Sequence, residues 1–162
     1  MKIKTTLIAL LLVSGFVACT NKSSSNSASD NKTVNQKANR MENLISIVEI
    51  PVTDFSRAVT FYQSILGIKI EEMEMDDVKM GVFPSYGETV NVVLASGKNY
   101  QPATSGALIY LNAGKDLKPV LDKISKNGGK VIIPKTAISP EMGFFALFMD
   151  TEGNKLGLHS AY

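Results

Sequence analysis

Two side chains capable of acid–base chemistry stand where an apolar residue is expected. His159 is the only histidine among the 162 residues, and it follows the apolar run near the end of the chain. Glu49 is the only charged residue in the stretch LISIVEIPV, residues 44–52. In such places an imidazole or a carboxylate can hydrogen-bond within the fold, contact a ligand, bind a metal ion or transfer a proton. These roles stay open, and in the catalytic case Glu49 accepts the proton while His159 orients the substrate.

Strand alternation indicates which residues accompany these two. Residues two apart on a strand share a face, so Gly157 and His159 share one face of the strand expected at 155–160. Ile47 and Glu49 share one face of the strand expected at 44–52, and the apolar residues between them face the other way. We therefore expect Ile47, Glu49, Gly157 and His159 to line one substrate pocket, which the loop residues Tyr86 and Tyr100 could cap.

The elements that must position these residues occur in the same order in both halves of the chain. Thr53 and Asp54 are typical helix-start residues, and Gly67 is a typical helix stop. In the first half the patterns predict a strand at 44–52, a helix at 55–66, and strands at 68–72, 79–84 and 89–95. In the second half they predict a strand at 107–112, a helix at 117–124, and strands at 130–133, 144–149 and 155–160.

The two halves align at a constant offset of 62 residues. Helix-start aspartates and turn glycines recur at this spacing, as in the pairs Asp54/Asp116, Gly67/Gly129 and Gly81/Gly143. A constant offset indicates a duplicated unit. The predicted fold class is α+β, with two βαβββ modules at 44–95 and 106–160 that form a curved mixed sheet around a cleft, helices outside.

The first 42 residues have a different composition from the rest. Residues 1–18 begin with lysines and continue with a short apolar run, which is typical of a signal peptide. The segment Phe16-Val17-Ala18-Cys19 resembles the lipobox of a bacterial lipoprotein, which implies lipidation of Cys19 and a cell-envelope location. Ordinary secretion with a free thiol is the alternative. Residues 19–42 are rich in Ser, Asn and Lys and predict a flexible tether to a domain at 43–162.

Two longer segments, IPVTDFSRAVTFYQSILG and GFFALFMDTEGNKLGLHS, resemble the vicinal oxygen chelate superfamily, which includes glyoxalase I, bleomycin-resistance proteins and extradiol dioxygenases. The resemblance covers nearly all of residues 44–160 and implies two βαβββ modules around a cavity, often with dimerisation. It also implies a divalent metal held by His and Glu side chains on four strands. The corresponding positions here are Ile47, Asn91 or Val93, Ala107 or Ile109, and Gly157.

None of these positions carries a side chain that binds a divalent metal as metalloenzymes require. We therefore expect no metal cofactor and, as the leading hypothesis, binding of a small-molecule ligand, comparable to the bleomycin-resistance branch. A lyase or isomerase that uses Glu49 and His159 is the second hypothesis, and an accessory envelope module without a ligand is the third. The net charge of +2 without a basic stripe argues against nucleic acid, and a homodimer is a further expectation.

Overall fold

The computed structural model describes residues 44–87 and 89–162, which belong to one compact unit, Arg40–Tyr162. The predicted signal peptide, the lipidation site Cys19 and the tether at 19–42 lie outside the described residues. Of the helices in the described part of the chain, none combines the length and the apolar character needed to cross a bilayer.

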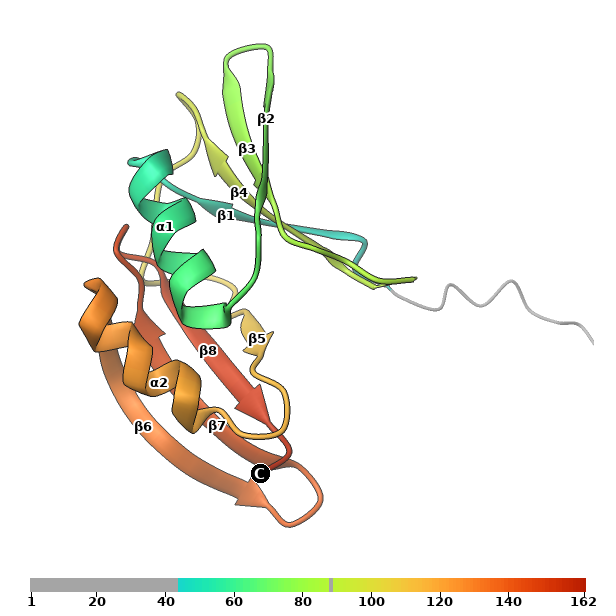
Figure 1. The fold of residues 1–162 in the computed structure, drawn as a ribbon, viewed down its shortest axis with the longest axis vertical. Coiled ribbons are helices and arrows are strands. Elements are labelled where there is room, and N and C mark those ends of the chain that lie inside the picture. The colour runs from blue at the N-terminus through green and yellow to red at the C-terminus, as the bar shows by residue number, and fades with distance from the viewer. Residues whose placement is uncertain (1–43, 88) are drawn as a thin grey trace, which may run out of the picture. The chain divides into compact units, whose positions relative to one another are not determined.

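Eight strands and two α-helices repeat one pattern twice (Figure 1). The first module contains β1 (Ile47–Pro51), α1 (Phe55–Leu66), β2 (Glu71–Met75), β3 (Val78–Val82) and β4 (Asn91–Ser96). The second contains β5 (Tyr110–Asn112), α2 (Lys118–Ile124), the 3-10 turn η1 (Ser125–Asn127), β6 (Lys130–Ser139), β7 (Gly143–Met149) and β8 (Lys155–Ser160).

The strand pairing confirms the α+β fold class and the two βαβββ modules. The eight strands divide into two four-stranded sheets, with orders β1-β4-β3-β2 and β5-β8-β7-β6. In each sheet the first and last strands of the module pair in parallel, and the other neighbours are antiparallel. The same pairing in both halves agrees with the duplication inferred from the sequence.

Local signals explain where α1 begins and ends. The Asp54 side chain accepts a hydrogen bond from the Arg57 backbone N–H at 3.0 Å, as an N-cap does. Gly67 ends the helix with a left-handed φ of 67°. In the second module the left-handed residue is Gly128, with φ of 91°, the first glycine of the pair 128–129 that the sequence predicts as the helix end; the constant offset aligns Gly67 with the second, Gly129. The η1 turn ends one residue earlier because it tightens the last turn of the helix.

The two modules share one hydrophobic core. Helix α1 of the first module packs against α2, and its Phe61 ring lies 6.4 Å from the ring of Phe148 on β7 of the second module. The Tyr62 hydroxyl donates a hydrogen bond to the Asp150 carboxylate at 2.7 Å, also across the module boundary. Burial of large side chains from both halves in one cluster therefore fixes the second sheet against the first.

Several strand boundaries differ from the predictions. β5 begins at Tyr110 rather than 107, and β2 begins at Glu71 rather than 68. β6 continues to Ser139, beyond the expected end at Ile133, with a register shift between Ile133 and Thr136. Pro134 lies at that shift and has no N–H to donate, which an edge strand tolerates.

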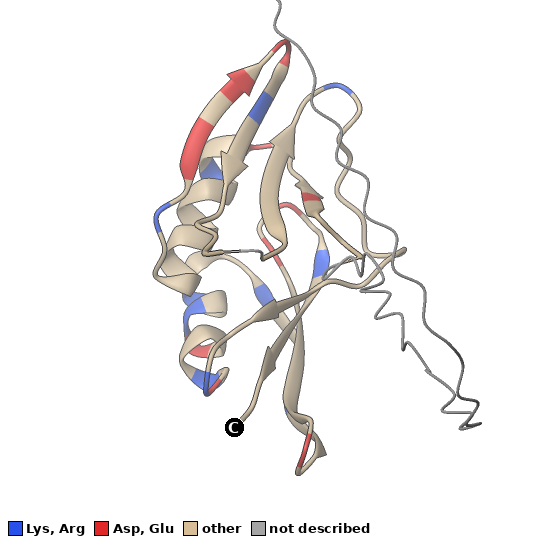
Figure 2. Ribbon diagram, turned by 90° about the vertical axis from the view of Figure 1, so that its right-hand side faces the viewer, with Lys and Arg blue, Asp and Glu red and all other residues tan. Residues whose placement is uncertain are grey.

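Charged residues protect the β2 edge of the first sheet. Figure 2 shows acidic residues gathered on β2 and on the turn that follows it. The β2 sequence is EEMEM, and all five of its residues are exposed. Like charges on an edge strand discourage pairing with another chain.

Candidate functional site

The predicted pocket residues lie on sheet faces that point away from the helices. On β8, Leu158 is fully buried in the core, whereas His159 on the alternate face is exposed. On β1, Ile50 is 2% exposed and packs in the core, whereas Glu49 is exposed and Ile47 is 57% exposed. The alternation expected from the sequence therefore holds on both strands.

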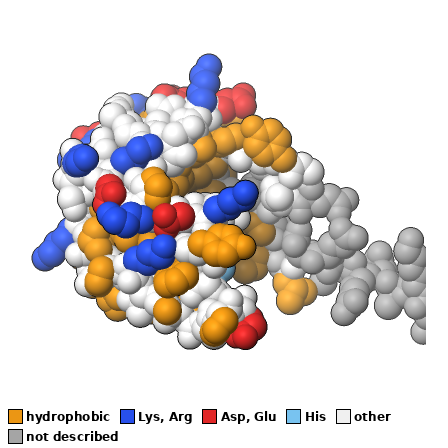
Figure 3. Space-filling view, turned by 60° about the horizontal axis from the view of Figure 1, so that its bottom comes forward, with side chains coloured by type: hydrophobic (Ala, Val, Ile, Leu, Met, Phe, Trp, Pro, Cys, Tyr) orange, Lys and Arg blue, Asp and Glu red, His pale blue; other side chains and the backbone are white. Residues whose placement is uncertain are grey.

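His159 lies in an apolar pocket of about 400 Å³, which we call the histidine pocket. Its other lining residues are large and apolar or aromatic, namely Tyr110, Ile138, Met142 and Phe145. The rings of Tyr110 and Phe145 meet edge to face with centroids 6.5 Å apart. In Figure 3, hydrophobic side chains (orange) lie beside the small visible part of the histidine (pale blue).

The imidazole of His159 is oriented by the β6–β7 turn. Its Nε2 lies 2.7 Å from the backbone oxygen of Met142. A carbonyl oxygen only accepts, so Nε2 carries a proton and donates it. In the neutral imidazole, Nδ1 is then an acceptor, and it makes no hydrogen bond with any residue of the described ranges 44–87 and 89–162.

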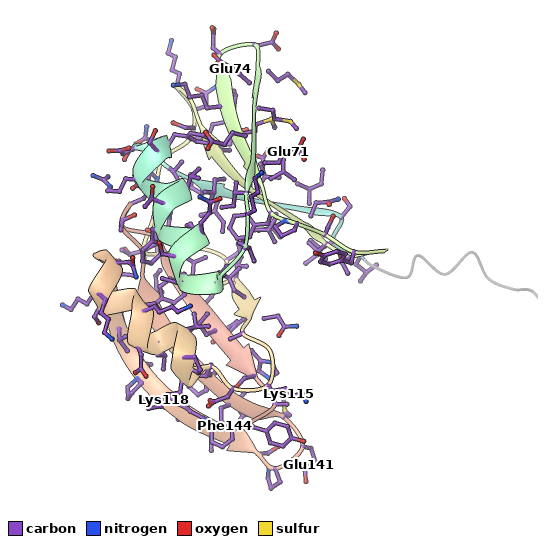
Figure 4. The ribbon with its side chains drawn as sticks, in the orientation of Figure 1. Glu71, Glu74, Lys115, Lys118, Glu141 and Phe144 are labelled. Atoms are coloured by element: carbon purple, nitrogen blue, oxygen red, sulfur yellow. The ribbon has the colours of Figure 1, made fainter. Side chains whose placement is uncertain are left out.

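The turn that carries Met142 is ordered by its own side chains. The Ser139 hydroxyl donates to the Glu141 carboxylate at 2.8 Å and accepts from the Met142 N–H at 3.1 Å. The hydrogen bond from Ser139 lowers the pKa of Glu141. Figure 4 shows Glu141 at the tip of the turn and Phe144 just beyond it on β7. Hydrogen bonds within the turn thus fix the position of Met142, which forms one wall of the histidine pocket.

Position 157 requires a glycine because a neighbouring ring leaves no space for a side chain, and not because of its backbone conformation. It does not have a positive φ, but a Cβ built on it would overlap the ring of Tyr110. Tyr110 pairs with Gly157 across β5 and β8, so its ring lies over the strand at that point. Sequence reasoning missed Tyr110 because it aligned the family position with Ala107 or Ile109. Ile109 packs against the core and, with Ala107, lines the pocket that contains Glu49.

Glu49 lines a second pocket of about 230 Å³, which we call the glutamate pocket. The Tyr100 hydroxyl donates to the Glu49 carboxylate at 3.2 Å. Lys155 of β8 lines the same pocket, and sequence reasoning gave no signal for it. The glutamate pocket and the histidine pocket share no lining residue. The structure therefore places Glu49 and His159 at separate pockets.

In the enzymes that this sequence resembles, side chains at these strand positions hold a metal ion. The residues at the same positions here are not suited to hold one. Ile47 and Gly157 have no side-chain donor atom, and the Tyr110 ring covers Gly157. Within the part of the chain that the structure describes, no three His, Cys, Asp or Glu side chains group in a way that could hold a metal ion.

The acidic turn before β8 joins the modules. Glu152 accepts hydrogen bonds from the backbone N–H of Asp54 and the hydroxyl of Thr53, each at 2.8 Å, and pairs with Arg57 Nε at 2.8 Å. Burial raises the pKa of Glu152, but the hydrogen bonds from Arg57, Asp54 and Thr53 outweigh it and lower the pKa to about 2. This carboxylate anchors the start of α1 and is engaged in the fold.

Comparison with known proteins agrees with the architecture. The family model of the Glyoxalase/Bleomycin resistance protein/Dioxygenase superfamily matches residues 44–158. A glyoxylase-like domain-containing protein from Didymella fabae is 34% identical over 113 residues, which cover 68% of this chain and 88% of that protein.

Solved structures share the fold at low identity. Glyoxalase I from Zea mays is 19% identical with a TM-score of 0.58, and the match covers 71% of this chain but 45% of the maize chain. This chain thus spans about half the length of that enzyme. An antibiotic binding protein from Streptomyces sp. CB03234 is 21% identical with a TM-score of 0.58, and the match covers 75% of this chain and 98% of that one.

Proposed function

Because this chain belongs to the Glyoxalase/Bleomycin resistance protein/Dioxygenase superfamily, we propose that its glyoxalase-like domain binds a small aromatic molecule with a hydroxyl group, without a metal ion, in the histidine pocket. The observation that carries this proposal is a pocket of about 400 Å³ whose walls are apolar or aromatic except for one imidazole. Small-molecule sites commonly combine apolar walls with a few placed polar groups.

The pocket's chemistry defines the ligand class. A planar ring can pack against Tyr110 and Phe145, whose edge-to-face arrangement leaves ring surface for a third aromatic group. Because Nε2 of His159 faces the Met142 oxygen, Nδ1 is the ring atom left to accept a hydrogen bond, and the complementary ligand group is an O–H donor. The shared fold with an antibiotic binding protein supports a binding role.

A matched pair of probes tests this proposal on the purified full chain. We expect 2-naphthol to bind and to shift the ring signals of the only histidine in an NMR titration. Its methyl ether, 2-methoxynaphthalene, should bind about tenfold more weakly because it cannot donate to Nδ1. Tyr110→Ala should weaken 2-naphthol binding, and Tyr86→Ala, at a strongly exposed tyrosine outside the pocket, is the control.

Two results would contradict the proposal. One is an unchanged histidine spectrum at saturating 2-naphthol. The other is stoichiometric Ni, Zn, Mn or Fe in the purified chain that is lost on Glu49→Gln or His159→Phe.

The enzymatic alternative is less favoured. A lyase or isomerase that uses Glu49 as proton acceptor and His159 as orienting group needs a substrate that reaches both pockets, and these share no lining residue. It predicts that Glu49→Gln abolishes turnover of a compound with neighbouring carbonyl and hydroxyl oxygens but leaves folding intact. Equal turnover by both proteins would argue against this role.

The location of the protein is proposed from the sequence. Lipidation of Cys19 would attach the domain to a bacterial envelope membrane through the segment 19–42. A homodimer remains a proposal that rests on the family resemblance and is measured by light scattering of the purified chain.

A further inference from the structure

The glutamate pocket brings opposite charges from the two modules to one small site. Glu49 comes from β1 and Lys155 from β8, and both line the same pocket of about 230 Å³. We propose that this pocket is a second binding site, for a small zwitterion whose ammonium group meets Glu49 and whose carboxylate meets Lys155.

The acidic side of the pocket is oriented. The Tyr100 hydroxyl holds one Glu49 oxygen at 3.2 Å, which leaves the other oxygen for a ligand. Burial raises the pKa of Tyr100, and the neighbouring Glu49 charge raises it further, so the phenol remains a donor at neutral pH. Glu49 therefore presents its other carboxylate oxygen in a defined direction.

The basic side is anchored through its backbone. The Lys155 N–H donates to the Ala103 oxygen at 3.2 Å, which ties β8 to the segment between β4 and β5. The Lys155 side chain is half-buried. Across residues 44–87 and 89–162, neither Lys155 nor Glu49 forms an ion pair. Each charge is thus available to an opposite charge on a ligand.

The apolar lining and the volume limit the size of the ligand. Ala103, Ala107 and Ile109 also line the pocket and give it apolar wall area. A short methylene chain would pack against this lining. Since a water molecule occupies about 30 Å³ in the liquid, the pocket holds a molecule of fewer than about ten heavy atoms. A short ω-amino acid has this size and both charges.

The site is independent of the histidine pocket. Lys155, Gly157 and His159 share one face of β8. Each is separated from the next by two positions, which is about 7 Å along a strand. The Tyr110 ring lies over Gly157, the middle residue, and so stands between the two pockets. Occupation of one pocket does not require occupation of the other.

Calorimetric and NMR titrations of the full chain with three probes test this inference. We expect 4-aminobutyrate to bind saturably, and butyrate and butylamine, which each lack one charge, to bind at least tenfold more weakly. Glu49→Gln and Lys155→Gln should each weaken 4-aminobutyrate binding at least tenfold. Glu72→Gln and Lys69→Gln, at exposed residues outside the pocket, are matched charge controls and should change it less than twofold.

Several results would overturn the inference. They are the absence of saturable 4-aminobutyrate binding, equal binding of either singly charged probe, or unchanged binding in the Glu49→Gln and Lys155→Gln variants. A thermal melt of each variant identifies loss of folding, and the conservative Lys155→Arg variant, which keeps the charge, should retain binding. Binding of 2-naphthol is measured in parallel, so failure of the histidine pocket is distinguished from failure of this site.

Discussion

The Glu152 carboxylate is shielded from solvent and holds the start of α1 through Thr53, Asp54 and Arg57. Its folded-state pKa of about 2 lies below its ordinary value of 4.5. A carboxylate with a lowered pKa contributes stability that is fully present above pH 4.5 and is lost as the pH falls from 4.5 toward 2. Acid should therefore loosen the contact between the modules.

We predict that Glu152→Gln lowers the free energy of unfolding at pH 7 by about 1–2 kcal/mol, a value reduced for the half-exposed Arg57 partner. The difference from the natural chain should shrink at pH 3, because part of the carboxylate's contribution is already lost there. Urea unfolding at both pH values measures this. Glu72→Gln, at an exposed carboxylate on β2, is the control, and an equal loss at pH 7 and pH 3 would contradict the pKa argument.

The contact between Gly157 and Tyr110 also acts at the residue scale. Glycine disfavours a strand, and its place in β8 is explained by the ring that lies over it. The cost of a methyl group there should depend on whether the ring is present.

We predict that Gly157→Ala lowers the free energy of unfolding by about 1–3 kcal/mol in the natural chain, because the new Cβ displaces the Tyr110 ring. In a Tyr110→Ala background the same change should be neutral or stabilising by up to about 1 kcal/mol, since alanine costs less backbone entropy than glycine. A double-mutant cycle from urea unfolding measures the coupling. Additive effects would mean that the ring does not require the glycine.

At the scale of elements, the two helices play unequal parts. α1 has 12 residues, caps at both ends and five buried residues, of which Phe61 and Tyr62 contact residues of the second module. α2 has seven residues, and Ile124 is the only one of them that is fully buried. The duplicated units have therefore diverged in how much each helix contributes to the core.

We predict that the amide hydrogens of α1 exchange with deuterium at least about tenfold more slowly than those of α2, because opening α1 disrupts packing in both modules. Hydrogen–deuterium exchange followed by mass spectrometry measures this. The turns that follow the two helices, which are both exposed, provide the internal reference. Equal protection of α1 and α2 would show that the modules open as one unit.

At the scale of the whole molecule, the sequence before residue 43 determines where the domain is expected to act. Cys19 is the only cysteine of the chain, so lipidation is tested by a single substitution. Attached acyl chains contribute about 0.8 kcal/mol per buried CH₂ to membrane binding.

We predict that the chain made in a bacterial host incorporates labelled palmitate and fractionates with membranes, and that Cys19→Ser abolishes both. Ser14→Ala, within the expected signal peptide, is the control and should leave labelling intact. Labelling of the Cys19→Ser variant, or a natural chain without label in the soluble fraction, would contradict lipidation at this residue.

The sequence by itself determined the order of the elements, the start of α1 at Asp54 and the faces of β1 and β8. These features depend on neighbours within a few residues, through capping and through alternation along a strand. The duplication was also visible, because the same residue types recur at the constant offset. It did not specify the one-residue difference that puts Gly128, not Gly129, in the left-handed position.

Only the tertiary structure decided what surrounds Glu49 and His159. The β5–β8 register puts the Tyr110 ring over Gly157, and the segment between β4 and β5 brings Tyr100 to Glu49. Both contacts join residues about 50 positions apart in the chain, and they depend on strand pairing and loop packing between these distant segments. Alternation along a single strand carries no information about such packing, so one predicted pocket became two.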